Sequence, residues 1–187
     1  MTLVFLENKM ARQLDPKWVA YFKLFISSRL VRGGSINPIF INHINKAFTA
    51  VKLRPFVVSD QTPISGSFLG GIFTAVGLEE KLPRSFYRPI DWQSAGVELK
   101  KPAYGCVAVV RCDGVEKVGI VLGQTSNGSL KILIAHHDSE VNISDHNKEN
   151  IIAYRWVGET DTPSLHRYEL PVLKSGVIKS KLFIERV

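Results

Sequence analysis

The residues with the strongest metal-binding chemistry cluster near the end of one apolar run. His136, His137 and Asp138 are consecutive, and His146 follows. Imidazole and carboxylate groups are common zinc ligands. In a strand, however, adjacent side chains point to opposite faces, so only one of the two consecutive histidines can face a given site. Because the spacing also lacks the pattern of a zinc motif, we expect no metal and no cofactor.

Two cysteines, Cys106 and Cys112, are the other groups with intrinsic reactivity. Both fall in one apolar run of strand character, six residues apart. At ~3.3 Å per residue they would lie ~20 Å apart, which is too far for a disulfide. We therefore expect two buried free thiols.

Composition restricts the class of protein. The chain has 187 residues, 45% hydrophobic and 22% charged, which is typical of one globular domain. The net charge of +7 suits nucleic acid, anionic lipid or an acidic partner, but the basic residues are scattered, so nucleic acid is not the expected partner. No apolar stretch is long enough for a membrane span, and the start, MTLVFLENKM, has no features of a signal peptide.

An aromatic helix is expected over residues 15–32. Asp15 can cap it, Pro16 can begin it, and Gly33-Gly34 can end it. Three aromatic residues on its apolar face are candidates for interactions: Trp18, Phe22 and Phe25. Such a helix can lie on a membrane surface, but we favour docking on its own domain or on a partner chain.

Two further helices and a set of strands follow. The pattern predicts helices over 38–51 and 67–78, the second ending at Gly77 and lying centrally, because its Gly70-Gly71 pair must be offset by burial. From residue 100 the chain predicts strands, with Asp113-Gly114 and Asn127-Gly128 as hairpin turns. The predicted strands are 104–111, 117–124, 130–137 and 151–158, with possible edge strands in the tail. Helices followed by an antiparallel meander define an α+β fold.

Four stretches in this order resemble the NlpC/P60 superfamily of papain-like cell-wall peptidases, in the short form of bacteria and phages. In that form a D-E-T-P-W-C-S-A-F stretch opens the central helix, and P-G-D-I-V-V-F, H-V-G-F and Y-R-W strands follow. The corresponding stretches here are 59–68 (SDQTPISGSF), 102–110 (PAYGCVAVV), 117–123 (KVGIVLG) and 154–156 (YRW). The resemblance implies a papain-like domain over 36–158, with an N-terminal helical extension, 1–35, and a C-terminal strand extension, 159–187.

The resemblance also implies a cysteine nucleophile at the start of the central helix, a histidine base on the facing strand, and a polar residue that orients the base. In this chain the nucleophile position falls on Ser65, the base position on Lys117, and the orienting position on His136 or His137. A solvated lysine is protonated at neutral pH and cannot act as a base. We therefore expect an inactive site, with Ser65 capping the helix and Lys117 on the surface or paired.

A serine–lysine dyad of Ser65 and Lys117 is the alternative, and it requires a buried, neutral lysine. The neighbouring Glu116 would not help, since it points to the opposite face of the strand. Arg88 and Trp92 lie in the segment that borders the substrate groove in active members of the family, although Trp92 is better explained as a core residue.

Together these features predict a non-catalytic structural or binding protein. The absence of a visible signal peptide and the frequency of the family in phages suggest a virion component, such as a tail or baseplate protein. Its partners would be other protein subunits, contacted through the 15–32 helix and the 165–187 tail, which could add a strand to a neighbour's sheet. The alternatives are a peptidoglycan amidase or endopeptidase, and a wall-binding module that does not cleave.

Overall fold

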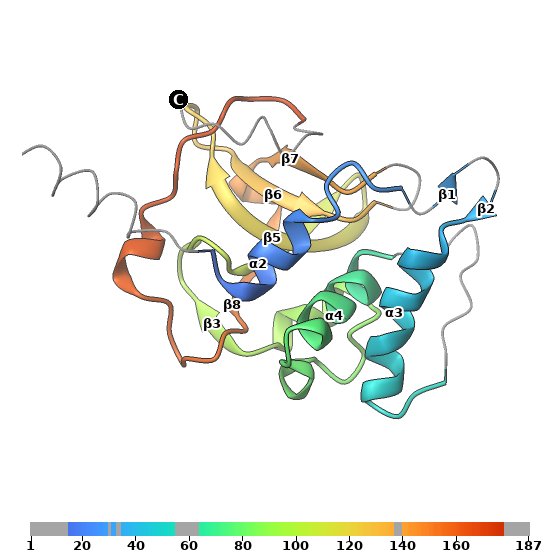
Figure 1. Ribbon diagram of the computed structural model, residues 1–187. Coiled ribbons are helices and arrows are strands. Elements are labelled where there is room, and N and C mark those ends of the chain that lie inside the picture. The colour runs from blue at the N-terminus through green and yellow to red at the C-terminus, as the bar shows by residue number, and fades with distance from the viewer. Residues whose placement is uncertain (1–14, 30, 33–34, 55–63, 137–139, 178–187) are drawn as a thin grey trace, which may run out of the picture.

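The fold places a curled antiparallel sheet on one side of the molecule and two helices, α3 and α4, on the other (Figure 1). The computed structural model describes residues 15–29, 31–32, 35–54, 64–136 and 140–177. A shorter helix, α2, crosses between the sheet and α4 in the view of Figure 1. Within these described ranges no helix is long and apolar enough to cross a membrane.

Six strands form the main sheet, in the order β3-β8-β4-β5-β6-β7, and every neighbouring pair is antiparallel. They are β3 (Val97–Leu99), β4 (Val107–Cys112), β5 (Val115–Gln124), β6 (Leu130–Ile134), β7 (Asn142–His146) and β8 (Ile151–Trp156). The turn between β4 and β5 has positive φ at Asp113 and Gly114, as an Asp-Gly hairpin requires. The predicted α+β class with an antiparallel sheet is confirmed. The sheet is not a simple meander, because β8 pairs with β4 and β3 instead of following β7 at the edge.

Two strands of the main sheet, β3 and β7, were not predicted, and neither were β1 (Val31–Arg32) and β2 (Ser35–Ile36). β7 includes part of a polar stretch that reads as a turn, and it forms because β6 supplies a full ladder from Leu130↔His146 to Ile134↔Asn142. β3 pairs with β8 at the opposite edge. The described tail forms a 3-10 helix, η4 (Leu165–Tyr168), and one isolated bridge from Val172 to Gln124, which is less than a full edge strand. Residues 178–187 lie outside the described part.

Helix α4 (Ser65–Ala75) is central, as predicted, although it begins two residues early. Nine of its residues are buried, from Ser65 to Phe73. Its two glycines allow close contacts: a Cβ added at Gly70 would lie 2.4 Å from the Phe86 ring, and one added at Gly71 would lie 2.6 Å from the His43 carbonyl oxygen. Gly77, at φ +74°, follows the end of the helix.

Helix α3 (Pro38–Ala50) packs against α4 and matches its predicted range closely. Asn37 caps it by accepting a hydrogen bond from the Ile39 backbone N–H at 3.0 Å. Its buried face includes Phe40, His43, Ile44, Ala47 and Phe48. A short hairpin of β1 (Val31–Arg32) and β2 (Ser35–Ile36) precedes it.

Helix α2 (Lys17–Lys23) is much shorter than the predicted 15–32 helix, and Asp15 does not cap it. The Asp15 carboxylate instead accepts hydrogen bonds from Lys23 Nζ and, at 2.5 Å, from the Tyr104 hydroxyl. After α2 the chain turns and pairs with the residues that precede β7, through Ser27 N–H to the Val141 carbonyl at 2.9 Å. The predicted end at Gly33-Gly34 lies outside the described residues.

The aromatic face of α2 belongs to the protein's own core. Trp18 is 5% exposed and Phe22 is 1% exposed. Trp18 stacks on Phe73 and donates its indole N–H to the Gly105 carbonyl at 2.8 Å. Phe25 is half-buried and meets Phe68 edge to face. Phe22 is therefore not available to a partner, which corrects its assignment as an interaction candidate.

Candidate functional site

Ser65 stands at the first position of α4, directly against strand β5. Its side chain is buried, and its Oγ accepts a hydrogen bond from the Val118 backbone N–H at 3.2 Å. The N-cap of α4 is Ile64, and Ser65 makes no capping bond. The prediction that Ser65 caps the helix is therefore wrong, since its oxygen accepts a hydrogen bond from strand β5 instead. The Thr62-Pro63 part of the motif that precedes it lies outside the described residues.

The hydrogen bond exists because β5 has an open position at Val118. On one side, Val118 pairs with Val109 of β4. On the other side, the β6 ladder covers β5 only from Ile120 to Gln124. The Val118 N–H therefore lies beyond the end of the ladder, where an unpaired buried donor would be costly. The Ser65 hydroxyl satisfies it.

Lys117 precedes Val118 in β5 and is half-buried. Its positive charge contributes to lowering the pKa of two histidines. Burial, and then Lys117, lower the pKa of His136 to about 4, and the same two causes lower the pKa of His146. The structure thus gathers Ser65, Lys117 and His136, the three predicted site residues, around one end of β5. His137 and Asp138 lie outside the described residues.

A second group of reactive side chains adjoins Lys117 and was not predicted as a unit. Cys112 Sγ, at the end of β4, lies 3.4 Å from His146 Nδ1 on β7. His146 Nε2 lies 2.9 Å from Ser144 Oγ. The sequence contains a hint of this arrangement, because Ser144 and His146 are two residues apart and share one face of a strand. Only the curl of the sheet brings Cys112 to them.

Neither cysteine forms a disulfide, as predicted. Cys106 is buried, which raises the pKa of its thiol to about 12. Cys112 is only half-buried, which departs from the prediction that both thiols are buried. Among the described residues, no group of three histidines, cysteines or carboxylates could hold a metal ion.

The remaining candidates have structural roles. Trp92 is fully buried and donates its indole N–H to the Phe86 carbonyl at 2.7 Å. Arg88 is exposed and lies 3.8 Å from the Asp91 carboxylate. Arg155 donates to the Ala95 carbonyl at 2.7 Å, and Trp156 is buried.

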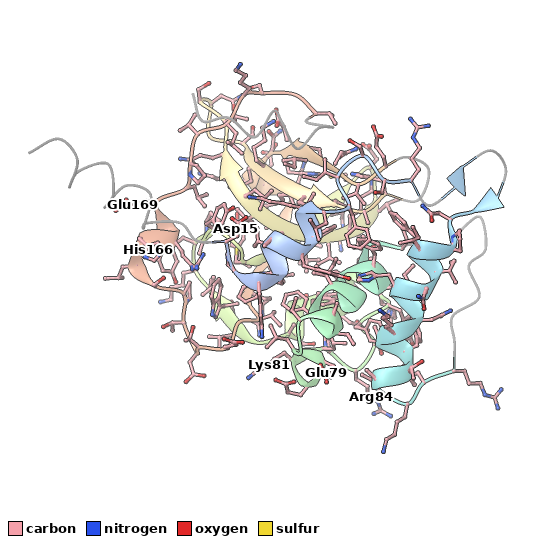
Figure 2. All side chains as sticks on the ribbon, viewed as in Figure 1. Asp15, Glu79, Lys81, Arg84, His166 and Glu169 are labelled. Atoms are coloured by element: carbon pink, nitrogen blue, oxygen red, sulfur yellow. The ribbon has the colours of Figure 1, made fainter. Side chains whose placement is uncertain are left out.

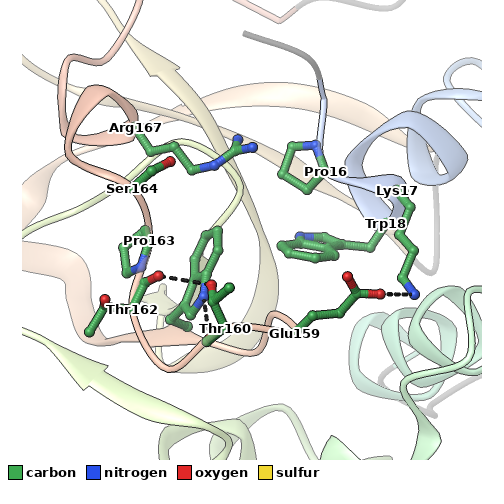
Figure 3. A pocket seen from close by; sticks show the side chains of 10 residues that line it. Pro16, Lys17, Trp18, Glu159, Thr160, Thr162, Pro163, Ser164 and Arg167 are labelled. Atoms are coloured by element: carbon green, nitrogen blue, oxygen red, sulfur yellow. Dashed lines mark hydrogen bonds and ion pairs between the residues drawn. The ribbon is translucent and has the colours of Figure 1, made fainter. Parts of the chain in front are cut away.

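A pocket of about 440 Å³ opens beside Trp156, at the end of β8 (Figure 3). Its walls come from the start of α2 and from the segment 159–167. The Arg167 guanidinium lies over the Trp156 ring at 5.9 Å, and Lys17 forms an ion pair with Glu159 at the rim. The other lining residues are Pro16, Trp18, Thr160, Thr162, Pro163 and Ser164. The pocket combines an aromatic wall, hydroxyl groups and charges of both signs.

Comparison with known families, curated proteins and solved structures finds no match to this chain.

Proposed function

We propose that the protein is a catalytically inactive, NlpC/P60-like binding protein that holds other protein subunits in a larger particle, such as a phage tail or baseplate. The hydrogen bond from the Val118 N–H to Ser65 Oγ is the observation that carries this proposal. Ser65, at the nucleophile position, is buried, and its Oγ already accepts a hydrogen bond from the backbone. An attacking hydroxyl must instead face its substrate and a base.

The position of Lys117 also argues against catalysis at Ser65. A serine–lysine dyad needs a buried, neutral lysine that can take up the serine proton. Lys117 is only half-buried, and among the described residues no hydrogen bond joins it to Ser65, whose oxygen accepts from the Val118 N–H instead. We therefore assign Ser65, Lys117 and His136 a structural role.

The pocket beside Trp156 is the place where a partner would bind. Tryptophan and arginine are the residues most enriched among those that dominate binding energy at protein interfaces. Here Trp156 and Arg167 are stacked, and two prolines line the same pocket. Rigid aromatic and proline walls lose little conformational entropy when a peptide segment is bound. A segment of a neighbouring subunit suits this site better than a small polar ligand.

The test combines an activity measurement with the assembly state. Purified protein and its Ser65→Ala variant are incubated with peptidoglycan fragments, and products are followed by mass spectrometry. We expect no cleavage by either protein. Size-exclusion chromatography with light scattering, on the free chain and on material from an intact particle, should find the chain stably associated with other subunits.

Cleavage that disappears in Ser65→Ala would overturn the proposal and favour a hydrolase. Binding of the fragments without cleavage would favour a wall-binding module instead. A Trp156→Ala variant that assembles as tightly as the wild type would remove the pocket from the partner interface.

A further inference from the structure

Cys112, His146 and Ser144 form a hydrogen-bonded chain across the sheet. The Cys112 Sγ to His146 Nδ1 distance is 3.4 Å, which is normal for a hydrogen bond to sulfur. The His146 Nε2 to Ser144 Oγ distance is 2.9 Å. The three residues come from β4 and β7, which are separated by two strands in the sheet order. Both ring nitrogens of His146 are therefore engaged, one by a thiol and one by a hydroxyl.

This arrangement orients the imidazole for proton transfer. Burial keeps His146 neutral at pH 7 by lowering its pKa, so the ring carries one N–H. With that hydrogen on Nε2, donating to Ser144, Nδ1 is left to accept from the Cys112 thiol. Thiol, imidazole and orienting hydroxyl are the parts that nucleophilic catalysis by cysteine requires.

Polar and charged side chains surround this chain of residues. Asn142 precedes Ser144 by two residues on β7, so it shares the same face, and it is 7% exposed. Its side chain forms a hydrogen bond with His136, and the charge of Lys117 acts on the rings of both His136 and His146. A cation beside a thiol favours the thiolate and attracts an anionic ligand.

We infer that Cys112 is a nucleophilic thiol that undergoes exchange with anionic, low-molecular-weight disulfides, with His146 as its base and Ser144 as a positioning residue. In the exchange, His146 Nδ1 removes the Cys112 proton and the sulfur attacks one sulfur of the disulfide. A new S–S bond forms at Cys112, the old S–S bond breaks, and the leaving thiolate takes the proton from the imidazolium. No electrons are gained or lost overall, because one disulfide replaces another.

The product of this exchange is a stable mixed disulfide. Resolution within the chain would need a second thiol whose Cα lies within about 7 Å. Cys106 is buried and six residues from Cys112, at or beside one strand, and is therefore ~20 Å away. The site would act as a point of covalent modification and not as a turnover enzyme. This inference is independent of the proposed function, which concerns Ser65 and the pocket.

The experiment measures the second-order rate of mixed-disulfide formation with oxidised glutathione, by intact mass and peptide mapping on the full chain. We expect one adduct, at Cys112, and none in Cys112→Ser. His146→Asn should slow the reaction at least about tenfold, because general-base catalysis is lost. Ser144→Ala should slow it less. A neutral disulfide, hydroxyethyl disulfide, should react more slowly than oxidised glutathione if Lys117 attracts the anionic probe.

His166 provides a matched control. Ser164 Oγ lies 3.5 Å from His166 Nε2, the same two-residue spacing, on η4 at the outer edge of the molecule (Figure 2). His166→Asn should leave the rate unchanged. An adduct confined to Cys106, an absent adduct, or equal rates in wild type and a folded His146→Asn would overturn the inference.

A pH series on the wild type decides the question even if His146→Asn fails to fold. His146 is faced by Cys112 from β4, Lys117 from β5 and His136 after β6, with Asp145 on its own strand. Burial lowers the pKa of His146 below its ordinary value of 6.5, so the base stays mainly neutral at pH 6.5 and above, and we expect the rate to stay nearly level from pH 8 to pH 6.5. A small reference thiol loses about tenfold per pH unit below its own pKa. A tenfold loss per unit at Cys112 would contradict a base at His146.

Discussion

The Ser65 hydroxyl and the Val118 backbone N–H meet at 3.2 Å, where the start of α4 touches strand β5 beyond the end of the β6 ladder. A single side-chain oxygen thus replaces a missing strand partner. This contact joins the helical layer to the sheet, and it determines what the residue at this position can do.

Replacing Ser65 should therefore affect stability. Ser65→Ala leaves the buried Val118 N–H without an acceptor, and we expect a loss of about 1–2 kcal/mol in the free energy of unfolding. Urea denaturation followed by circular dichroism measures it. Ser67→Ala is the control on the same helix, because the Ser67 hydroxyl is fully buried and makes no hydrogen bond within the described residues. That variant should be neutral or slightly stabilising, and equal losses in both variants would contradict the role of the Ser65 bond.

Restoring the family's residues tests whether the Ser65 position retains a catalytic geometry. In a Cys112→Ser background, the Ser65→Cys/Lys117→His pair places a thiol and an imidazole at the two positions. We expect iodoacetamide to label the cysteine faster in the double replacement than with Ser65→Cys alone, because a histidine favours the thiolate and a lysine cannot take its proton. Rates followed by mass spectrometry give the comparison. Equal rates would separate this site from the papain-like arrangement.

The close approach of α3 to α4 should not tolerate a methyl group at Gly71. Alanine gains about 1 kcal/mol of helix propensity over glycine. Its Cβ would lie 2.6 Å from the His43 carbonyl oxygen, which is backbone and cannot move aside easily. We expect a net destabilisation of about 1–3 kcal/mol. Gly77→Ala is the comparison: nothing lies within 4 Å of its added Cβ, and only its positive φ is strained, so it should cost about 1 kcal/mol. If Gly71→Ala is instead stabilising, the helices have room to separate.

Removing either member of the Lys131–Asp145 ion pair should lower stability, but by unequal amounts. Lys131 is 0% exposed, forms an ion pair with Asp145 across the β6–β7 ladder, and donates to the Gly176 carbonyl. Asp145→Asn leaves a buried charge without its counter-ion, which should cost about 3 kcal/mol. Lys131→Met leaves only the Asp145 carboxylate, whose side chain is 30% exposed and can be hydrated, so we expect about 1 kcal/mol. Thermal and urea unfolding of both variants measure the order, and a larger loss in Lys131→Met would contradict it.

Stability should fall as the pH is lowered from 6.5 toward 4. Burial lowers the pKa of His43 to about 4, from an ordinary value of 6.5, as it does for His136. The unfolded chain therefore binds protons in this range that the folded chain excludes, so the contribution is complete above pH 6.5 and is lost as pH approaches 4. For His43 alone this amounts to about 3 kcal/mol.

His43→Leu tests this prediction, since the His43 ring packs among Tyr21, Phe25 and Phe68, and its Nε2 makes no hydrogen bond within the described residues. Urea midpoints between pH 7 and pH 4.5 should vary less in the variant than in the wild type. The remaining slope, due in part to His136, should shrink again in His43→Leu/His136→Asn. An unchanged slope in His43→Leu would show that His43 is not buried in its neutral form.

The sequence by itself determined the local elements and the chemistry of each position. Helical spacing located α3, the Gly70-Gly71 pair marked α4 as central, and the Asp-Gly turn located the β4–β5 hairpin. These features depend on neighbours in the chain, which periodicity and turn preference report directly. The prediction of one long helix over 15–32 was wrong, because the residues after Lys23 pair with the backbone at Val141 instead of continuing the helix.

Only the tertiary structure decided which groups meet. Strand β7 is too polar to be predicted, because its stability comes from the β6 ladder rather than from its own residues. Ser65 became an acceptor for Val118 because β6 ends early, and Cys112 reached His146 because the sheet curls. Contacts between residues far apart in the chain depend on packing, which no local pattern encodes.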